Sequence, residues 1–262
     1  MTDQSAHFPK FYVTAATPCP YIEGKTERKI FTELREQPLA YDKKTILEYR
    51  GPEDDQQHSE ELHHSLALIG FRRSQDIVYR PACEDCHECK SVRVPVILHN
   101  QSKSQKRIYN KNNDIIFEIK PNIATDEQYD LLYKYIDKRH ITGGMAGISF
   151  SEYKDMVESS PISTVIIEYR LPDGTLIGAA LTDQMKNSLS MVYSFFNISP
   201  EMNKRSLGVF IVLNHIRIAE TRGLDYVYLG YFVKDSPKMN YKSNFKPLEI
   251  LNSNGWKLVK SV

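Results

Sequence analysis

The order of helices and strands predicted for the C-terminal half constrains the fold of this 262-residue chain more than any other feature. Apolar residues alternate or run continuously in the strand segments and recur at helical spacing in the helices. The predicted elements are a helix behind a capping box at 125–128, a helix near 151–158, strands over 164–170, 176–184 and 189–198, a long helix over 205–222, and a strand over 225–233. This mixture predicts an α+β fold.

The N-terminal part is more irregular. The elements expected there are a charged helix over 25–35, a helix from Ser59 as N-cap to Gly70 as stop, and strands over 72–80 and 91–98. The two strands flank a loop with three cysteines, which indicates a hairpin with a stapled tip. We therefore expect a smaller cysteine-containing module over residues 1–100, packed against a larger domain over residues 101–262.

The charge of the chain is balanced, with a formal net charge of +1, which excludes a generally basic nucleic-acid coat and an acidic disordered chain. The longest apolar run, Val209 to Leu213, is too short to span a membrane, and residues 1–10 lack the apolar centre of a signal peptide. We expect a cytoplasmic protein with no membrane partner. Segment 90–111 has no acidic residue and is either a solvated surface or a phosphate-contacting patch. Its candidate phosphate contacts are Lys103, Lys106, Arg107 and Lys111.

Cys83, Cys86 and Cys89 are spaced so that three thiolates can converge on one centre. Cys19, from the N-terminal loop, is a candidate fourth ligand. Four thiolates suit a tetrahedral zinc ion or an iron–sulfur cluster, with a structural or regulatory role. A reduced loop without metal is the alternative.

The loop before the long helix reads Arg205-Ser206-Leu207-Gly208-Val209-Phe210. With the element order above, it resembles the GNAT acyltransferase fold, in which the third and last strands lie parallel and splay apart around an acyl donor. In members that use CoA, this loop holds a pyrophosphate at the helix N-terminus, so Arg205 and Gly208 are candidate substrate-binding residues. Phe210 replaces a small residue of that loop and argues against CoA, unless its ring faces the core.

Longer blocks resemble the aminoacyl-tRNA–protein transferase family of the N-degron pathway over nearly the whole chain. The N-terminal blocks include Cys19-Pro20-Tyr21-Ile22, Gly70-Phe71-Arg72-Arg73-Ser74 and Tyr79-Arg80-Pro81-Ala82-Cys83. The C-terminal blocks include Leu181-Thr182-Asp183, Tyr193-Ser194-Phe195-Phe196, Tyr228-Leu229-Gly230-Tyr231 and Lys238-Met239-Asn240-Tyr241-Lys242. The short length and the Cys-x2-Cys-x2-Cys spacing are similar to the bacterial branch, the aspartate/glutamate leucyltransferases.

The resemblance implies transfer of leucine from Leu-tRNA to the α-amine of proteins that begin with Asp or Glu, which marks them for the N-degron machinery. The chemistry requires no cofactor, because an α-amine with a pKa of about 7.7–8.0 is partly neutral and the ester is reactive. Asp183 is a candidate to orient the amine or take its proton, and is otherwise a charged turn residue. Tyr193, Tyr228 and Tyr231 are candidates to hydrogen-bond the aminoacyl ester, and are otherwise packing residues.

The acidic acceptor side chain needs a cation. The candidates by motif membership are Arg80, Lys238 and Lys242 with its neighbour Tyr241, and more weakly Arg28. Three alternatives stay open: arginyl transfer to the same acceptors, a GNAT enzyme that uses acyl-CoA, and a non-catalytic RNA-binding module. The last lacks any RNP or KH motif.

Overall fold

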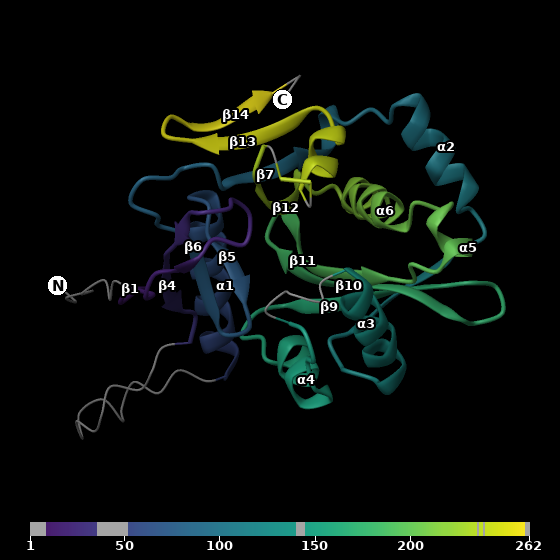
Figure 1. Ribbon diagram of the computed structural model, residues 1–262, viewed down its shortest axis with the longest axis horizontal. Helices are drawn as coiled ribbons and strands as arrows, with labels where there is room; N and C mark the ends of the chain where they lie inside the picture. The colour runs from purple at the N-terminus through teal and green to yellow at the C-terminus, as the bar shows by residue number, and fades with distance from the viewer. Residues whose placement is uncertain (1–8, 36–51, 140–144, 235, 238, 260–262) are drawn as a thin grey trace.

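The structure is a computed structural model, and it describes residues 9–35, 52–139, 145–234, 236–237 and 239–259. Its main feature is an eight-stranded sheet in the order β14-β13-β7-β12-β11-β10-β9-β8 (Figure 1). In chain order these strands are β7 (Lys90–Pro95), β8 (Ile116–Pro121), β9 (Thr164–Arg170), β10 (Leu176–Met185), β11 (Ser188–Phe196), β12 (Tyr226–Phe232), β13 (Leu248–Asn252) and β14 (Gly255–Val259). The α+β prediction is confirmed, and the predicted strands from residue 164 onward end within two residues of the observed ones.

Strands β11 and β12 run parallel near the middle of the sheet and are paired over three residues, the last being Ser190 opposite Tyr228. Beyond this pair, β12 has a register irregularity before Gly230 and continues beside β7, while β11 continues beside β10. The two strands therefore separate, as the GNAT-like layout predicts. We call the region beyond the last pair, from Met191 on β11 and from Gly230 on β12, the strand opening. The helix α6 (Leu207–Thr221) makes the connection between the two strands.

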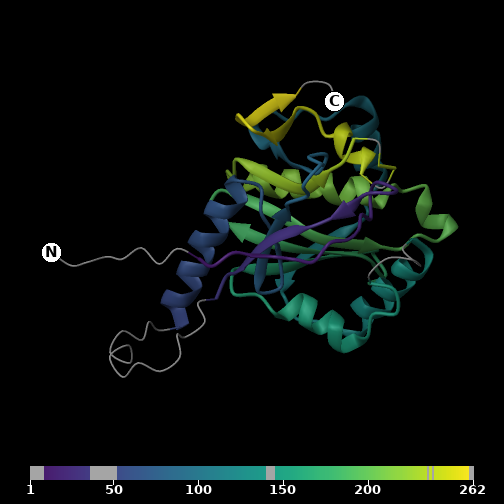
Figure 2. The same ribbon diagram turned by 60° about the vertical axis from the view of Figure 1, so that its left-hand side comes forward.

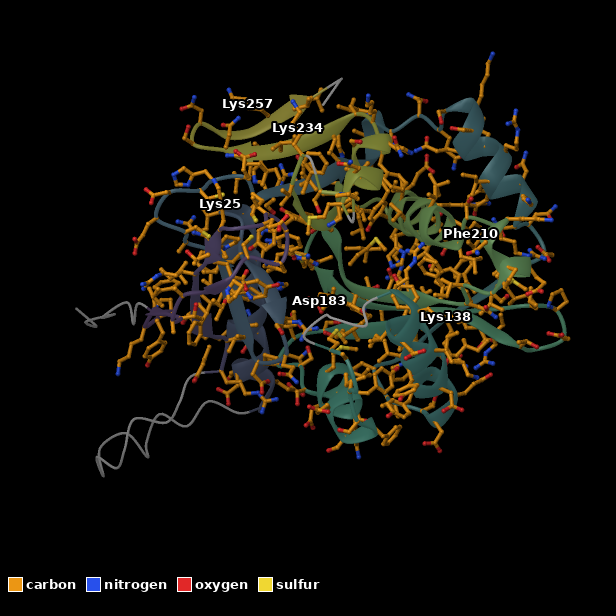
Figure 3. The ribbon with its side chains drawn as sticks, in the orientation of Figure 1. Lys25, Lys138, Asp183, Phe210, Lys234 and Lys257 are labelled. Atoms are coloured by element: carbon orange, nitrogen blue, oxygen red, sulfur yellow. The ribbon has the colours of Figure 1, made fainter. Side chains whose placement is uncertain are left out.

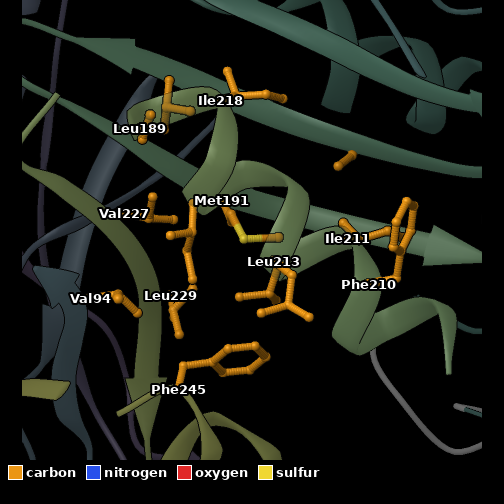
Figure 4. Packing of buried hydrophobic residues seen from close by; sticks show 14 of the residues in the cluster. Val94, Leu189, Met191, Phe210, Ile211, Leu213, Ile218, Val227, Leu229 and Phe245 are labelled. Atoms are coloured by element: carbon orange, nitrogen blue, oxygen red, sulfur yellow. The ribbon is translucent and has the colours of Figure 1, made fainter. Parts of the chain in front are cut away.

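Helices cover both faces of the sheet (Figures 1 and 2). Helix α6 packs on one face, and α3 (Asp126–Arg139) with α4 (Phe150–Glu158) packs on the other. Successive strand residues point to opposite faces, so Ile167 joins the core under α6 and Ile166 joins the core under α3 and α4. Each fully buried aliphatic side chain of this kind contributes about 1.5–3 kcal/mol. Figure 4 shows the core under α6, with Leu213 on the side of Leu229 and Val227 and with Phe210 and Ile211 farther along the helix.

A second sheet, in the order β1-β4-β6-β5, lies with α1 beside the large sheet (Figure 2). Its strands are β1 (Tyr12–Val13), β4 (Lys29–Glu33), β5 (Arg72–Ser74) and β6 (Ile77–Pro81). The remaining N-terminal elements are the short pair β2 (Thr17–Pro18) and β3 (Thr26–Glu27), and the helix α1 (Pro52–Leu68). Trp256 of β14 and Leu68 of α1 connect the two parts through a 2.9 Å hydrogen bond from the indole nitrogen to the carbonyl oxygen.

Two predictions for the N-terminal helices are wrong. The predicted helix over 25–35 is β3 and β4, because the β4 backbone pairs with β6 from Lys29 to Glu33. Ser59 does not cap a helix but lies buried within α1, where its hydroxyl donates to the carbonyl oxygen of Leu34 at 3.0 Å. The stop at Gly70 is confirmed, since this residue has φ +93° just beyond the helix.

The predicted cysteine hairpin is also wrong. Segment 72–80 is not one strand but the pair β5 and β6, which turns at Gln75 with φ +54°. Strand β6 belongs to the small sheet, whereas β7 pairs with β12 and β13 of the large sheet. Strand β7 is almost fully buried, and the predicted strand over 91–98 ends at Pro95, where a short 3-10 helix, η2 (Val96–Leu98), begins. The cysteine loop therefore joins two sheets.

Four elements were not predicted: α2 (Lys103–Lys111), the edge strand β8, the 3-10 helix η3 (Asn240–Asn244) and the C-terminal hairpin of β13 and β14. The short helix α5 (Pro200–Asn203) precedes α6. The module boundary at residue 100 stays a prediction, and β7, from before it, is hydrogen-bonded to strands from after it. No helix in the described part of the chain is long and apolar enough to cross a membrane.

Candidate functional site

Arg72 of the small sheet reaches into the strand opening. Its Nη2 donates to the carbonyl oxygen of Met191 on β11 at 2.7 Å and lies 3.4 Å from that of Val192. The guanidinium carbon also lies 5.8 Å from the ring centroid of Tyr231 on β12. One side chain from β5 therefore contacts both separated strands and brings a fixed positive charge between them.

Gly230 makes this position of Arg72 accessible. The residue has φ +81°, and a Cβ built on it would lie 1.8 Å from Nη1 of Arg72. Only glycine avoids both the left-handed backbone penalty and this overlap. The register irregularity of β12 and the guanidinium in the opening thus depend on one residue.

Lys242 brings a second cation to the same place. It lies on η3, is 7% exposed, and its Nζ donates to the carbonyl oxygen of Tyr231 at 2.5 Å. Burial, and then the positive charge of Arg72, lower the pKa of Lys242 to about 7. Among the described residues, neither Lys242 nor Arg72 has a carboxylate within ion-pair distance.

Tyrosines line the cation pair, but their hydroxyls are not all free. The hydroxyl of Tyr231 lies 2.9 Å from the carbonyl oxygens of Gly70 and Tyr79, to which it donates, and burial raises its pKa. Tyr241, next to Lys242, is 41% exposed. Tyr231 therefore ties β12 to the N-terminal part, and Tyr241 presents an aromatic surface beside the cations.

Asp183 lies at the contact between β10 and the small sheet, away from solvent (Figure 3). Arg73 donates to it from Nε at 2.9 Å and from Nη2 at 2.6 Å, and Thr164 donates to it at 3.0 Å. Nε2 of His63 lies 3.9 Å away, and burial lowers the pKa of this histidine. Both oxygens of the Asp183 carboxylate accept hydrogen bonds from protein groups, which favours a structural role that holds β10 to the small sheet. Its role as proton acceptor stays a prediction.

The other predicted catalytic tyrosines occupy different surroundings. The hydroxyl of Tyr228 accepts a hydrogen bond from Arg93 at 2.9 Å, and its ring packs edge-on to Trp256. Tyr193 packs into the core under α3 and α4 beside Phe195, and burial raises its pKa. Of the three predicted catalytic tyrosines, Tyr231 is the one that lies beside Arg72 and Lys242.

The candidate cations other than Lys242 are more exposed. Arg80 donates to the carbonyl oxygen of Ile69 at 3.2 Å and lies close enough to Tyr231 to influence its pKa. Arg28 makes an exposed contact with Glu84 at 3.6 Å. Lys238 lies outside the described residues.

The loop before α6 is built differently from the expected pyrophosphate site. Arg205 forms a two-pronged ion pair with Asp114 at 2.8 and 2.9 Å. Gly208 packs against the ring of Phe196, which a Cβ would meet at 2.9 Å. Phe210 is 3% exposed and packs its ring against Tyr169. The argument from Phe210 against CoA is therefore wrong, because the ring faces the core and does not fill the loop.

The four cysteines lie in one region of the structure. Burial, and then the neighbouring thiols of Cys19, Cys83 and Cys86, raise the pKa of Cys89 to about 12, so all four thiols are near one another. All four are partly exposed free thiols. Within the described ranges, however, no three His, Cys, Asp or Glu side chains are arranged to hold a metal ion. The donor types suit zinc or a cluster, while the arrangement in this structure does not.

The basic segment forms the helix α2, which begins with a capping box between Ser102 and Gln105. Its cations Lys103, Lys106, Arg107 and Lys111 are all exposed. Lys111 also donates to the carbonyl oxygen of Lys204 at 2.7 Å. Helix α2 packs on α6, so this basic surface has a fixed place relative to the sheet (Figure 1).

Arg72 is the site residue that had no predicted role. It belongs to the block Gly70-Phe71-Arg72-Arg73-Ser74, so motif membership was an available signal. Two adjacent arginines on a short strand point to opposite faces, and one of them enters the strand opening while the other binds Asp183. The pairing of β5 decides which arginine enters the strand opening and which binds Asp183, and no local sequence pattern predicts that pairing.

Comparison with known families and proteins gives a consistent match. The family model for "Arginine-tRNA-protein transferase, N terminus" matches residues 17–107, and that for "Arginine-tRNA-protein transferase, C terminus" matches residues 127–252. An aspartate/glutamate leucyltransferase of Parvibaculum lavamentivorans is 47% identical over 98% of each chain. Another, of Sphingomonas elodea, is 42% identical over 97% of this chain and 92% of that protein.

Two solved structures are similar at a much greater distance. FemX has a TM-score of 0.45 and 9% identity over 88% of this chain and 81% of its own. L-PGS from Bacillus licheniformis has a TM-score of 0.43 and 11% identity over 81% of this chain and 68% of its own.

Proposed function

The chain belongs to the aminoacyl-tRNA–protein transferase family, in its aspartate/glutamate leucyltransferase branch, and from this premise we propose which acceptors it uses and where it acts on them. The protein is an aminoacyltransferase that takes leucine from aminoacyl-tRNA. The acceptors are proteins whose first residue is Asp or Glu. The observation that supports this choice is the pair of cations, Arg72 and Lys242, at the strand opening.

The reaction is aminolysis of an ester. The neutral α-amine of the acceptor attacks the ester carbonyl of leucyl-tRNA, the carbon–oxygen bond to the terminal ribose breaks, and the proton lost by the amine ends on the ribose oxygen. The α-amine, with an ordinary pKa of about 7.7–8.0, needs only positioning and a route for one proton. We place the aminoacyl ester at the strand opening, where β11 and β12 leave backbone groups unpaired with each other.

The tRNA is held apart from the chemistry, on the exposed basic face of α2. Phosphates bind lysine and arginine side chains at exposed sites, and such binding weakens with salt. Charge reversal in Lys103→Glu with Lys106→Glu should weaken Leu-tRNA binding and flatten the dependence of log K on log salt by about one unit per lost contact. Lys257→Glu on the exposed face of β14 is the matched control and should leave both unchanged. Equal effects of the two replacements would contradict this placement.

The four cysteines are proposed as a structural or regulatory site for zinc or an iron–sulfur cluster. The support is that Cys19, distant in sequence, lies near the loop of Cys83, Cys86 and Cys89. Such a centre would stabilise the loop that joins the two sheets. No step of the proposed reaction passes through it. We further propose that the protein acts in the cytoplasm, where charged tRNA is made, and that its products enter the N-degron pathway.

The deciding experiment supplies labelled Leu-tRNA and Arg-tRNA to the full chain with peptides that begin with Asp, Glu, Asn or Lys. We expect leucine on the Asp and Glu peptides alone. Arginine on the same peptides would support arginyl transfer instead. Tight acetyl-CoA binding with no transfer from either tRNA would contradict the proposal.

A further inference from the structure

We propose that Arg72 and Lys242 together bind the side-chain carboxylate of the acceptor's first residue, and so determine its specificity for Asp and Glu. The inference rests on the proposed function and deepens it. It assigns acceptor recognition to one residue from strand β5 of the small sheet and one from the 3-10 helix η3, rather than to the exposed Arg80 or Arg28.

The charges of Lys242 and Arg72 support this assignment. Lys242 is 7% exposed, and within the described residues the one charged group that shifts its pKa is Arg72, another cation. Burying a cation without a counter-charge is costly, and a second cation nearby adds to the cost. Other buried arginines in this protein do have a carboxylate: Arg73 binds Asp183 and Arg93 binds Glu249. Because neither Arg72 nor Lys242 has a carboxylate partner among the residues that the structure describes, the pair fits an anion that arrives with the substrate.

The free hydrogen-bond donors of Arg72 and Lys242 also suit a carboxylate. Arg72 uses Nη2 for the Met191 carbonyl oxygen, while Nε and Nη1 have no hydrogen-bond acceptor among the described residues. An ammonium group has three donors, and Nζ of Lys242 uses one of them for the Tyr231 carbonyl oxygen. A carboxylate accepts several such bonds at once, and charge-assisted bonds are the strong ones. A bound carboxylate would also favour the charged form of Lys242, whose pKa lies near 7.

The position of the two side chains at the strand opening also suits the acceptor's first residue. The side-chain carboxylate of Asp or Glu is only a few bonds from the α-amine that attacks the ester. Arg72 lies across the strand opening in contact with β11 and β12, and Lys242 is bound to Tyr231 of β12. A carboxylate held there places the amine beside the proposed position of the aminoacyl ester. A phosphate of the tRNA is a poorer fit, because phosphate contacts favour exposed cations such as those of α2, and Lys242 is buried.

The test compares acceptor peptides that begin with Asp and with its neutral isostere Asn. Wild-type enzyme should prefer Asp strongly, because a site built for a charged group leaves cations unpaired when the amide binds. Arg72→Met should lower kcat/KM for the Asp peptide about 30- to 1,000-fold, mainly through KM, since one partner of a buried charge pair is lost. The slow transfer to the Asn peptide should change by less than about threefold, so that the Asp-to-Asn ratio collapses.

Lys242→Met is the second variant, because it replaces a buried ammonium by an apolar chain of similar length. It should lower the same ratio without loss of stability. Arg72→Lys should restore part of the ratio, since the charge is kept while the planar fork is lost. Arg222→Met, at an exposed arginine that donates to Gln184 far from the strand opening, is the matched control and should leave the ratio unchanged.

A parallel fall with Asp and Asn peptides would overturn the inference, because it would assign Arg72 to the chemistry or the fold. Loss of Leu-tRNA affinity in Arg72→Met, with the ratio intact, would assign the pair to a phosphate and would equally overturn it. Direct binding of the Asp and Asn peptides, measured by calorimetry without tRNA, distinguishes a failure of the carboxylate site from a failure of the proposed function. If wild-type protein binds the Asp peptide more tightly but transfers no leucine, the proposed function fails while the carboxylate site stands.

Discussion

Gly230→Ala tests the link between the backbone of β12 and the guanidinium of Arg72. The added methyl group would lie 1.8 Å from Nη1 of Arg72, so the side chain must leave its place. It then loses its 2.7 Å hydrogen bond to Met191, a charged bond worth about 1.5–3 kcal/mol. The left-handed backbone at φ +81° adds roughly 1–2 kcal/mol for any residue with a Cβ. We expect a total loss of about 2.5–5 kcal/mol in the free energy of unfolding, measured by urea denaturation with an unchanged m-value.

Gly174→Ala is the matched control, because Gly174 has φ +88° and a Cβ there meets nothing within 4 Å. It should show the backbone penalty alone, about 1–2 kcal/mol, with a normal Asp-to-Asn ratio in the transfer assay. The two variants should therefore differ by about 2 kcal/mol, and this difference should vanish when each is made in an Arg72→Met background. Equal losses in the two glycine variants, or a Gly230→Ala enzyme that still discriminates Asp from Asn, would show that Gly230 does not set the position of Arg72.

Three further outcomes are expected. Asp183→Asn should lower the free energy of unfolding by about 3–5 kcal/mol in urea, because Arg73 is left as a buried unpaired charge; full stability with kcat abolished would instead support a role in proton transfer. Burial lowers the pKa of His215 from 6.5 to about 4, so the unfolded chain binds the proton more readily between these values, and stability that is present above pH 6.5 should fall by roughly 3 kcal/mol as the pH drops to 4. Denaturation across this range should show the slope in wild-type protein and a weaker one in His215→Gln. Protein purified without oxygen should contain zinc or iron that Cys86→Ser lacks, and wild-type protein free of both metals would contradict the metal hypothesis.

The C-terminal elements could be predicted closely because their signals are local. The strand at β9, the capping box before α3 and the long helix α6 each follow from periodicity and end signals within one segment. The N-terminal part could not be predicted in this way. The segment at β4 has a helical pattern, yet pairing with β1 and β6 decides its conformation. Strand β7 looks like half of a local hairpin, yet its partners are β12 and β13, far along the chain.

Some features of the candidate site could likewise be predicted from local sequence, and others could not. The family blocks, the parallel pair that separates, the basic residues of segment 90–111 and Lys242 as a candidate cation could all be predicted from the sequence. That Arg72 enters the strand opening while Arg73 binds Asp183 depends on the tertiary structure. The same is true of Lys242, which lies near Arg72 without a carboxylate from the described residues. The physical reason is that helix and turn signals arise between neighbours in the sequence. The meeting of two like charges from β5 and η3 is set instead by how two sheets pack, and by a glycine that leaves room for one of them.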